Sequence, residues 1–361
     1  MNSGVMRTGA RSVVLRARTR FHNALDELSL NRHALIGSAL ARIILGGLGF
    51  YLYARDYMQR AYLWGPDGSW PWQNFTAPDG QQGFSLYSVS RSNAWFEIVF
   101  HLGMVFAFLF MVGWKTRAMN VLHYVFLWSL HQRNPVLLDG GDNVTVIVLV
   151  FFIFVDSGAR FSLDARHRKA KRASDSNLFR FRIGSLLHNA GILAVILQIC
   201  TVYLVSGMYK VQGRKWQNGT ALYYILRANE FGWPGVNRFI YESATLVVAI
   251  TYATVFFQLA FTFLLLNRKW RLFAVAGGIL MHLGIAVHMA GLVNFSLTVV
   301  AVELVIMGDA HYLRLAGAIR RLKGHPRTAE PGTTSADKPA APNPGEQVPP
   351  SAAPDPVLIS S

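Results

Sequence analysis

The stretch LLHNAGILAVILQICTVYLVS (186–206) is mostly apolar and contains no Lys, Arg, Asp or Glu. An α-helix rises about 1.5 Å per residue, so roughly 20 apolar residues cross the hydrocarbon core of a bilayer, which is about 30 Å thick. This stretch therefore predicts a transmembrane helix.

Seven further apolar segments also predict spanning helices, at about 34–53, 94–113, 118–131, 142–156, 242–266, 271–288 and 294–310. The segments 118–131 and 142–156 are short, and Pro135 and Gly140–Gly141 interrupt the chain between them. Because Pro and Gly break helices, the two segments are consistent either with two tilted helices or with one re-entrant pair. The sequence predicts an all-α, polytopic integral membrane bundle of about eight transmembrane helices.

The composition supports this fold class, because only 15% of the residues are charged. A soluble domain carries about 25% charged residues, so a soluble enzyme, a coiled coil and a disordered chain are all disfavoured. The net charge is +16. Such a charge suits nucleic acid, but here the bases stand between apolar stretches and are better explained by topology and anionic lipid. We expect the bilayer as a partner, and no nucleic acid.

The distribution of Lys and Arg predicts the orientation. If the N-terminus is cytoplasmic, the cytoplasmic segments hold 23 of these bases and the outer segments hold nine. Positive residues favour the cytoplasmic side, so both termini are expected inside the cell, in a multi-pass protein of the cell membrane. The expected organisation is a basic N-terminal segment (1–33), a transmembrane domain (34–310), and a basic stub with a disordered Pro/Ala-rich cytoplasmic tail (311–361).

Ionisable residues inside apolar segments are costly and often functional. Arg42 lies in the middle of the first segment, and its alternatives are a polar cavity, a backbone carbonyl, or a salt bridge to Asp142 or Glu97. His282 lies deep in the seventh segment, with Glu303 of the eighth as a potential partner. The single cysteine and the six-residue spacing of His282 and His288 give poor support to a metal site, so none is predicted.

The segment HQRNPVLLDGGDN (131–143) concentrates polar side chains at an outer membrane boundary. Non-helical backbone at that depth is tolerated where it is buried in protein or lines a cavity. Asp142 has the position of a helix cap. Arg133 and Asn134 belong either to a structural turn or to a binding region.

The segment VSGMYKVQGRKWQNGTALYYIL (205–226) places Lys210 at the outer end of the fifth span. A lysine in a low-dielectric environment loses its preference for charge and can act as a base. Tyr209 and Trp216 suit a pocket for a flat ring, but they equally suit an interfacial anchor. Base chemistry at Lys210 and simple anchoring are both open from the spacing.

Several of these motifs together resemble the HTTM (horizontally transferred transmembrane) family, the membrane module related to vitamin K-dependent γ-glutamyl carboxylase. The resemblance covers about residues 33–310 and rests on Arg42, GPDG (65–68), HQRNPVLLDGGDN, SLD (162–164), GMYKVQGRKWQNGTAL (207–222), Pro234, HLG (282–284) and Phe295. Within that family, the chain looks most like the branch of sporulation-delaying protein B, which acts in toxin maturation.

The resemblance implies roles that the residues alone do not specify. Lys210 matches the base of the carboxylase, although the spacing to Trp216 is one residue longer here, and His282 would be its proton partner. A reduced quinone, reduced vitamin K or menaquinone, would be the cofactor, with Arg42, Arg133, Asn134, Asp142, Tyr209 and Trp216 as binding residues. The carboxylase has a large lumenal domain after its membrane module, so here a small accessory membrane protein is expected to help bind a secreted peptide substrate.

Two classes of function follow. In the first, the protein is a membrane enzyme, carboxylase-like or peptide-maturing, that modifies a secreted peptide or toxin at the outer face. In the second, it is a non-catalytic binding, immunity or transport protein, whose polar residues form a core or a path. The effect of replacing Lys210 discriminates between them.

Overall fold

The structure, a computed structural model, describes residues 18–20, 22–23, 25–76, 83–170, 178–228 and 234–323. Contacts divide the chain into two units, Met1–Leu315 and Ala316–Ser361. Within the described part of the first unit, every regular element is helical. The expected disordered tail and most of the basic N-terminal segment lie outside the described residues.

Each of the eight predicted apolar segments coincides with a helix. These helices are α2 (Leu35–Arg55), α5 (Asn93–Val112), α6 (Thr116–Arg133), α7 (Gly140–Phe152), α9 (Leu178–Gln212), α13 (Ala244–Leu266), α14 (Arg271–His288) and α15 (Val293–Ile306). The all-helical prediction is confirmed for the described residues.

Short helices connect them. They are η1 (Tyr57–Gln59), α3 (Arg60–Trp64), α4 (Trp72–Thr76), η2 (Leu86–Val89), η3 (Pro135–Leu137), α8 (Leu163–Ala170), α10 (Arg214–Gln217), α11 (Ala221–Ile225), α12 (Pro234–Tyr241), η4 (Ala290–Leu292) and α16 (Asp309–Leu322).

Within the described residues, five helices are long and apolar enough to cross a membrane: α2, α5, α9, α13 and α14. A sixth is added if the bent pair Ala290–Ile306 and Asp309–Leu322 forms one span. The α7 helix is apolar but has only 13 residues, and α6 carries several polar side chains. The crossing of the membrane by all eight helices therefore stays a prediction, as does the cytoplasmic placement of the termini.

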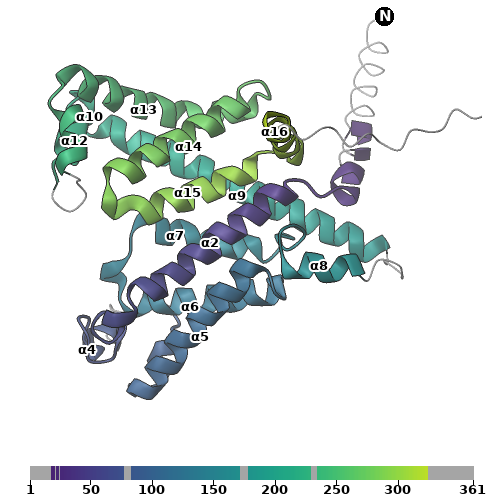
Figure 1. Ribbon diagram of the computed structural model, residues 1–361, viewed down its shortest axis with the longest axis horizontal. Coiled ribbons are helices and arrows are strands. Elements are labelled where there is room, and N and C mark those ends of the chain that lie inside the picture. Colours follow the sequence, from purple (N-terminus) through teal and green to yellow (C-terminus); the bar gives the residue numbers. More distant parts are fainter. Residues whose placement is uncertain are drawn as a thin grey trace, which may run out of the picture. The chain divides into compact units, whose positions relative to one another are not determined.

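The α2 helix lies between α5 and α15, and Figure 1 shows it running diagonally between them. Small side chains make this contact close, because a Cβ at Gly46 would come within 2.8 Å of the Met111 backbone. Close approach through glycine is typical of helices that pack in membranes. Further along the chain, α15 packs on α14, α7 and α9, and α9 packs on α13.

The α9 helix has 35 residues and is longer than the predicted segment 186–206 at both ends. Its N-terminal half includes polar residues that contact the chain around residue 32. Its last turn carries Lys210. One continuous helix therefore connects two polar clusters, one at each end.

Candidate functional site

Lys210 is half-buried on the last turn of α9. Its Nζ donates to Ser206 Oγ at 2.7 Å and lies 5.2 Å from the centre of the Trp216 ring, in a cation–π position. Among the described residues, no carboxylate forms an ion pair with Lys210. The ammonium group is therefore held by a hydroxyl and an aromatic ring.

Tyr203 lies two turns before Lys210 on the same helix, and a spacing of seven residues places both on one face. Its hydroxyl donates to Glu303 Oε1 of α15 at 2.5 Å. Its ring stacks on Phe261 of α13, with the ring centres 3.9 Å apart. Three helices thus fix the hydroxyl of Tyr203 against a fully buried carboxyl group.

His282 of α14 completes this cluster. Its side chain is 4% exposed, and its ring meets the Tyr203 ring edge-on, at 5.9 Å between centres. Lys210 lies two turns after Tyr203 on α9, on the same helix face. Lys210 and His282, the two residues that the sequence proposed for chemistry, are thus connected through Tyr203, which contacts His282 and shares a helix face with Lys210.

Gly278 explains why these groups can meet. A Cβ at this position would overlap Glu303 Oε1 and come within 2.9 Å of the Tyr203 hydroxyl. His282 follows four residues later on α14, and helical side chains lean toward the N-terminus of their helix. The imidazole therefore leans toward the Glu303–Tyr203 pair, over the space that the glycine leaves open.

The GGD motif of residues 140–142 packs against the same region. A Cβ at Gly141 would lie 2.6 Å from Phe295 Cα, and the Phe295 ring is 5.4 Å from the His282 ring between centres. Asp139 is the N-cap of α7, and the Asp142 carboxylate accepts a hydrogen bond from the Asp139 N–H at 2.9 Å. Asp142 therefore completes a capping box in which Asp139 holds the cap position.

Arg133 and Asn134 hold the preceding loop. Arg133 donates to the carbonyls of Gly65 and Trp70, and Asn134 Nδ2 donates to the Leu63 carbonyl at 2.8 Å. These contacts connect the HQRNP segment with the GPDG segment, two motifs more than 60 residues apart. The structural role is clear, whereas their predicted part in binding a cofactor stays a prediction.

Arg42 is fully buried, and its guanidinium donates to the carbonyls of Ser157 at 3.2 Å and Phe161 at 2.5 Å. Of the alternatives for Arg42, the structure shows hydrogen bonds to backbone carbonyls. The predicted salt bridge to Asp142 or Glu97 is therefore wrong. Glu97 instead pairs with Arg60 at 2.9 Å, and this hydrogen bond raises the pKa of the Arg60 guanidinium. Glu97 pairs with Arg60 because it lies on the first turns of α5, next to α3.

An open hollow of about 410 Å³ lies beside Trp216. It is lined by Lys215, Trp216, Ala221, Tyr224, Ile225 and Met289. Tyr209, in contrast, is 72% exposed and does not line it. The aromatic hollow is therefore built by α10, α11 and the turn after α14, and Trp216 is the residue that it shares with the Lys210 neighbourhood.

Sequence reasoning missed Tyr203, Phe261 and Gly278. Tyr203 stands seven residues before Lys210, and Gly278 stands four residues before His282, so each shares a helix face with a nominated residue. That periodicity is a usable signal. Phe261 gave none, because an aromatic side chain in an apolar helix is ordinary core.

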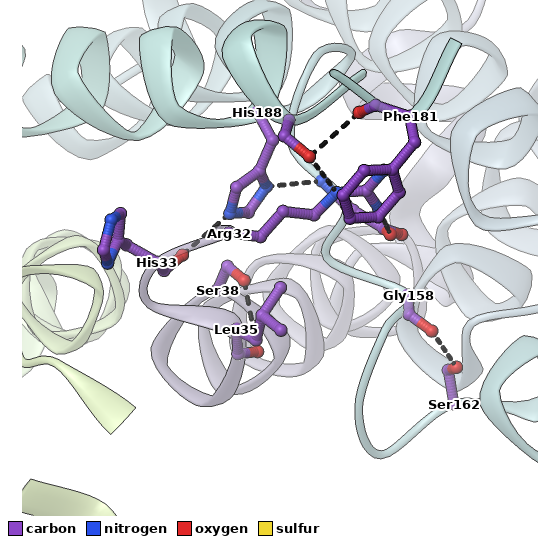
Figure 2. Close-up of polar contacts among 10 residues, drawn as sticks. Arg32, His33, Leu35, Ser38, Gly158, Ser162, Phe181 and His188 are labelled. Atoms are coloured by element: carbon purple, nitrogen blue, oxygen red, sulfur yellow. Dashed lines mark hydrogen bonds and ion pairs between the residues drawn. The ribbon is translucent and has the colours of Figure 1, made fainter. Parts of the chain in front are cut away.

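A second polar cluster surrounds the N-terminal half of α9 (Figure 2). His188 Nδ1 accepts from the Asp156 N–H at 2.9 Å, and its Nε2 donates to the His33 carbonyl at 2.7 Å. Arg32 pairs with Asp156 and donates to Ser185 Oγ. Because a backbone N–H can only donate, these bonds fix the neutral tautomer of His188. The cluster fastens the segment before α2 to α9.

Comparison with known proteins relates the chain distantly to two proteins of Bacillus subtilis (strain 168). It is 25% identical to the uncharacterized protein YitO over 228 residues, which are 61% of this chain and 70% of YitO. It is 24% identical to sporulation-delaying protein SdpB over 194 residues, which are 52% of this chain and 57% of SdpB. No family model and no solved structure matches the chain. The chain is therefore a distant relative of SdpB, and it covers little more than half of that protein's length.

Proposed function

We propose that this protein is a multi-pass protein of the cell membrane that matures or modifies a secreted peptide, with Lys210 as its base. The apolar helices and the distant similarity to SdpB support the membrane setting and the peptide substrate. The resemblance to the HTTM family supports a carboxylase-like reaction. A small accessory membrane protein and the peptide itself are the proposed partners.

The observation that carries this proposal is the setting of Lys210. Its Nζ contacts Ser206 and Trp216, and it has no carboxylate partner in the described chain. Ionisable side chains within a membrane are rare, and those without an ionic partner often mark functional sites. A lysine held by a hydroxyl and a ring can exchange its proton with a substrate while His282 receives or returns one.

A reduced quinone fits the residues beside Lys210. The hollow of about 410 Å³ falls in the size range of small-molecule sites, roughly 300–1,000 Å³. Trp216 and Tyr224 would hold the flat ring, and Met289 and Ile225 would contact its apolar parts. Such a cofactor would supply a ring hydroxyl that a base can deprotonate. The chain's own part is to orient the ring and to hold the proton at Lys210 Nζ.

The proposal is tested in the native host by replacing Lys210 with Met, which keeps the length of the side chain but removes the amine. The control is Arg214→Met, which removes one positive charge from the same segment. Peptides in the culture medium are compared by mass spectrometry at equal membrane levels of each variant. We expect a mature peptide mass to disappear in Lys210→Met only. Unchanged peptide masses in that variant would favour the binding, immunity or transport class.

A further inference from the structure

Two buried polar atoms in the Tyr203 cluster have no hydrogen-bond partner among the described residues. They are His282 Nδ1 and Glu303 Oε2. Leaving a polar atom unpaired inside a protein costs about 1–3 kcal/mol, so such atoms call for an explanation. Both belong to side chains that face Tyr203 from different helices, His282 from α14 and Glu303 from α15.

The surroundings of Glu303 do not suit a charged carboxylate. The residue is fully buried, its one hydrogen bond comes from Tyr203, and no cation pairs with it among the residues that the structure describes. Burying an unpaired charge in a low-dielectric interior is far more costly than burying the neutral acid. Glu303 is therefore a group that keeps its proton at rest.

Other ionisable groups on the helices that pack against α15 have their own partners. Arg42 of α2 donates to two carbonyls, and Asp142 of α7 belongs to the capping box. On α9, Lys210 lies two turns after Tyr203 on the same face, and its amine contacts Ser206 and Trp216. Among the described residues, Glu303 thus contacts Tyr203, Tyr203 contacts His282, and Lys210 follows on the Tyr203 face of α9.

We infer that Glu303 is a proton-carrying site that is coupled to Lys210 through Tyr203 and His282. Glu303 gives its proton toward His282 when Lys210 loses one to the outer face, and takes it back when Lys210 is protonated again, so no proton is created or lost. Glu303 is a positioning residue, because it acts through His282 and Lys210. The inference rests on the proposed base role of Lys210, but its test needs no peptide.

The experiment is infrared spectroscopy of the purified full-length protein in detergent. A protonated carboxylic acid gives a carbonyl stretch that is separate from that of a carboxylate. We expect such a band in the wild-type protein and its loss in Glu303→Gln. Tyr203→Phe removes the hydrogen bond to Glu303 Oε1, so it is expected to shift the band to higher frequency.

The coupling is tested with a pair of lysine variants. Lys210→Met is expected to shift the Glu303 band, whereas Lys215→Met, whose amine lies 3.8 Å from the centre of the Tyr224 ring, is expected to leave it in place. If Glu303→Gln does not fold, the shifts in Tyr203→Phe and Lys210→Met carry the test.

If the wild-type spectrum contains no carboxylic acid band that disappears in Glu303→Gln, the inference is overturned. A Glu303 band with the same frequency in Lys210→Met and in the wild type would also overturn it. A shifted band with normal peptide maturation in Lys210→Met would contradict the proposed function alone, so the two failures can be distinguished.

Discussion

Each end of α9 carries a cluster of buried polar side chains, and the two clusters differ in how many of their polar atoms are hydrogen-bonded. At the N-terminal end, both ring nitrogens of His188 are bonded, and the Asn189 amide bonds to Leu28, Asn31 and His33. At the C-terminal end, His282 Nδ1 and Glu303 Oε2 have no partner within the described chain.

This difference separates two uses of buried polar groups. A cluster in which the polar atoms are satisfied rigidifies the structure and defines how segments join. A cluster with unpaired atoms is less favourable, and natural proteins tolerate it mainly at sites that bind or react. The comparison predicts that substitutions at the N-terminal end mainly reduce stability, whereas those at the C-terminal end mainly reduce activity.

The largest effect on stability is expected for His188→Leu. This change removes the acceptor of the Asp156 N–H and the donor to the His33 carbonyl, and it lowers the free energy of unfolding by about 2–4 kcal/mol. Thermal unfolding of the purified protein measures the loss. The neighbouring Leu187→Ala serves as control, because Leu187 is 45% exposed. Equal unfolding midpoints for His188→Leu and wild type would show that the N-terminal cluster does not stabilise the fold.

Gly278→Ala is expected to have the next largest effect. The new Cβ would overlap Glu303 Oε1, so the carboxyl group must move, at a cost of about 1–3 kcal/mol. Gly284→Ala on the same helix is the matched control, because its Cβ has no neighbour within 4 Å. Unfolding and peptide maturation are both measured, and both should change in Gly278→Ala only. If the two variants behaved alike, the close packing at Gly278 would have no consequence.

Tyr203→Phe should destabilise by about 1–2 kcal/mol, because it removes a hydrogen bond and leaves the buried Glu303 Oε1 without its donor. The ring keeps its stack on Phe261, so the packing survives. We expect the yield of mature peptide to fall more than the stability does. A variant that keeps the wild-type yield would show that the bond to Glu303 is only structural.

Lys210→Met is expected to change the free energy of unfolding least, by about 0.5–1 kcal/mol, because a cation–π contact at a partly exposed site contributes no more than this. The effect on peptide maturation should nevertheless be complete. Thermal unfolding and secreted peptide masses from the same preparation check both. A marked loss of stability in this variant would show that Lys210 is a structural anchor, which contradicts the predicted effect on activity alone.

Much of the fold was predictable from the sequence. Apolar length is a local property, so the eight helices and their approximate bounds follow from it, and the long apolar segments indicated a membrane protein. Lys210 and His282 were also predictable as candidates, because a base or an imidazole inside an apolar helix is visible in the sequence. A helix cap was predicted at Asp142, but the structure gives the N-cap position to Asp139 and the third helical position to Asp142.

The partners of those residues required the tertiary structure. The sequence left an acid, a carbonyl and a polar cavity open for Arg42, and only the packing of α2 selected the carbonyls of Ser157 and Phe161. Nothing local connects Tyr203 with Glu303, because the two are 100 residues apart and meet only where α9 crosses α15 beside Gly278. Helix formation depends on near neighbours, whereas the meeting of polar groups depends on which helix faces pack. The sequence therefore determined the helices and the candidate base, and the tertiary structure decided that Tyr203 bonds to Glu303.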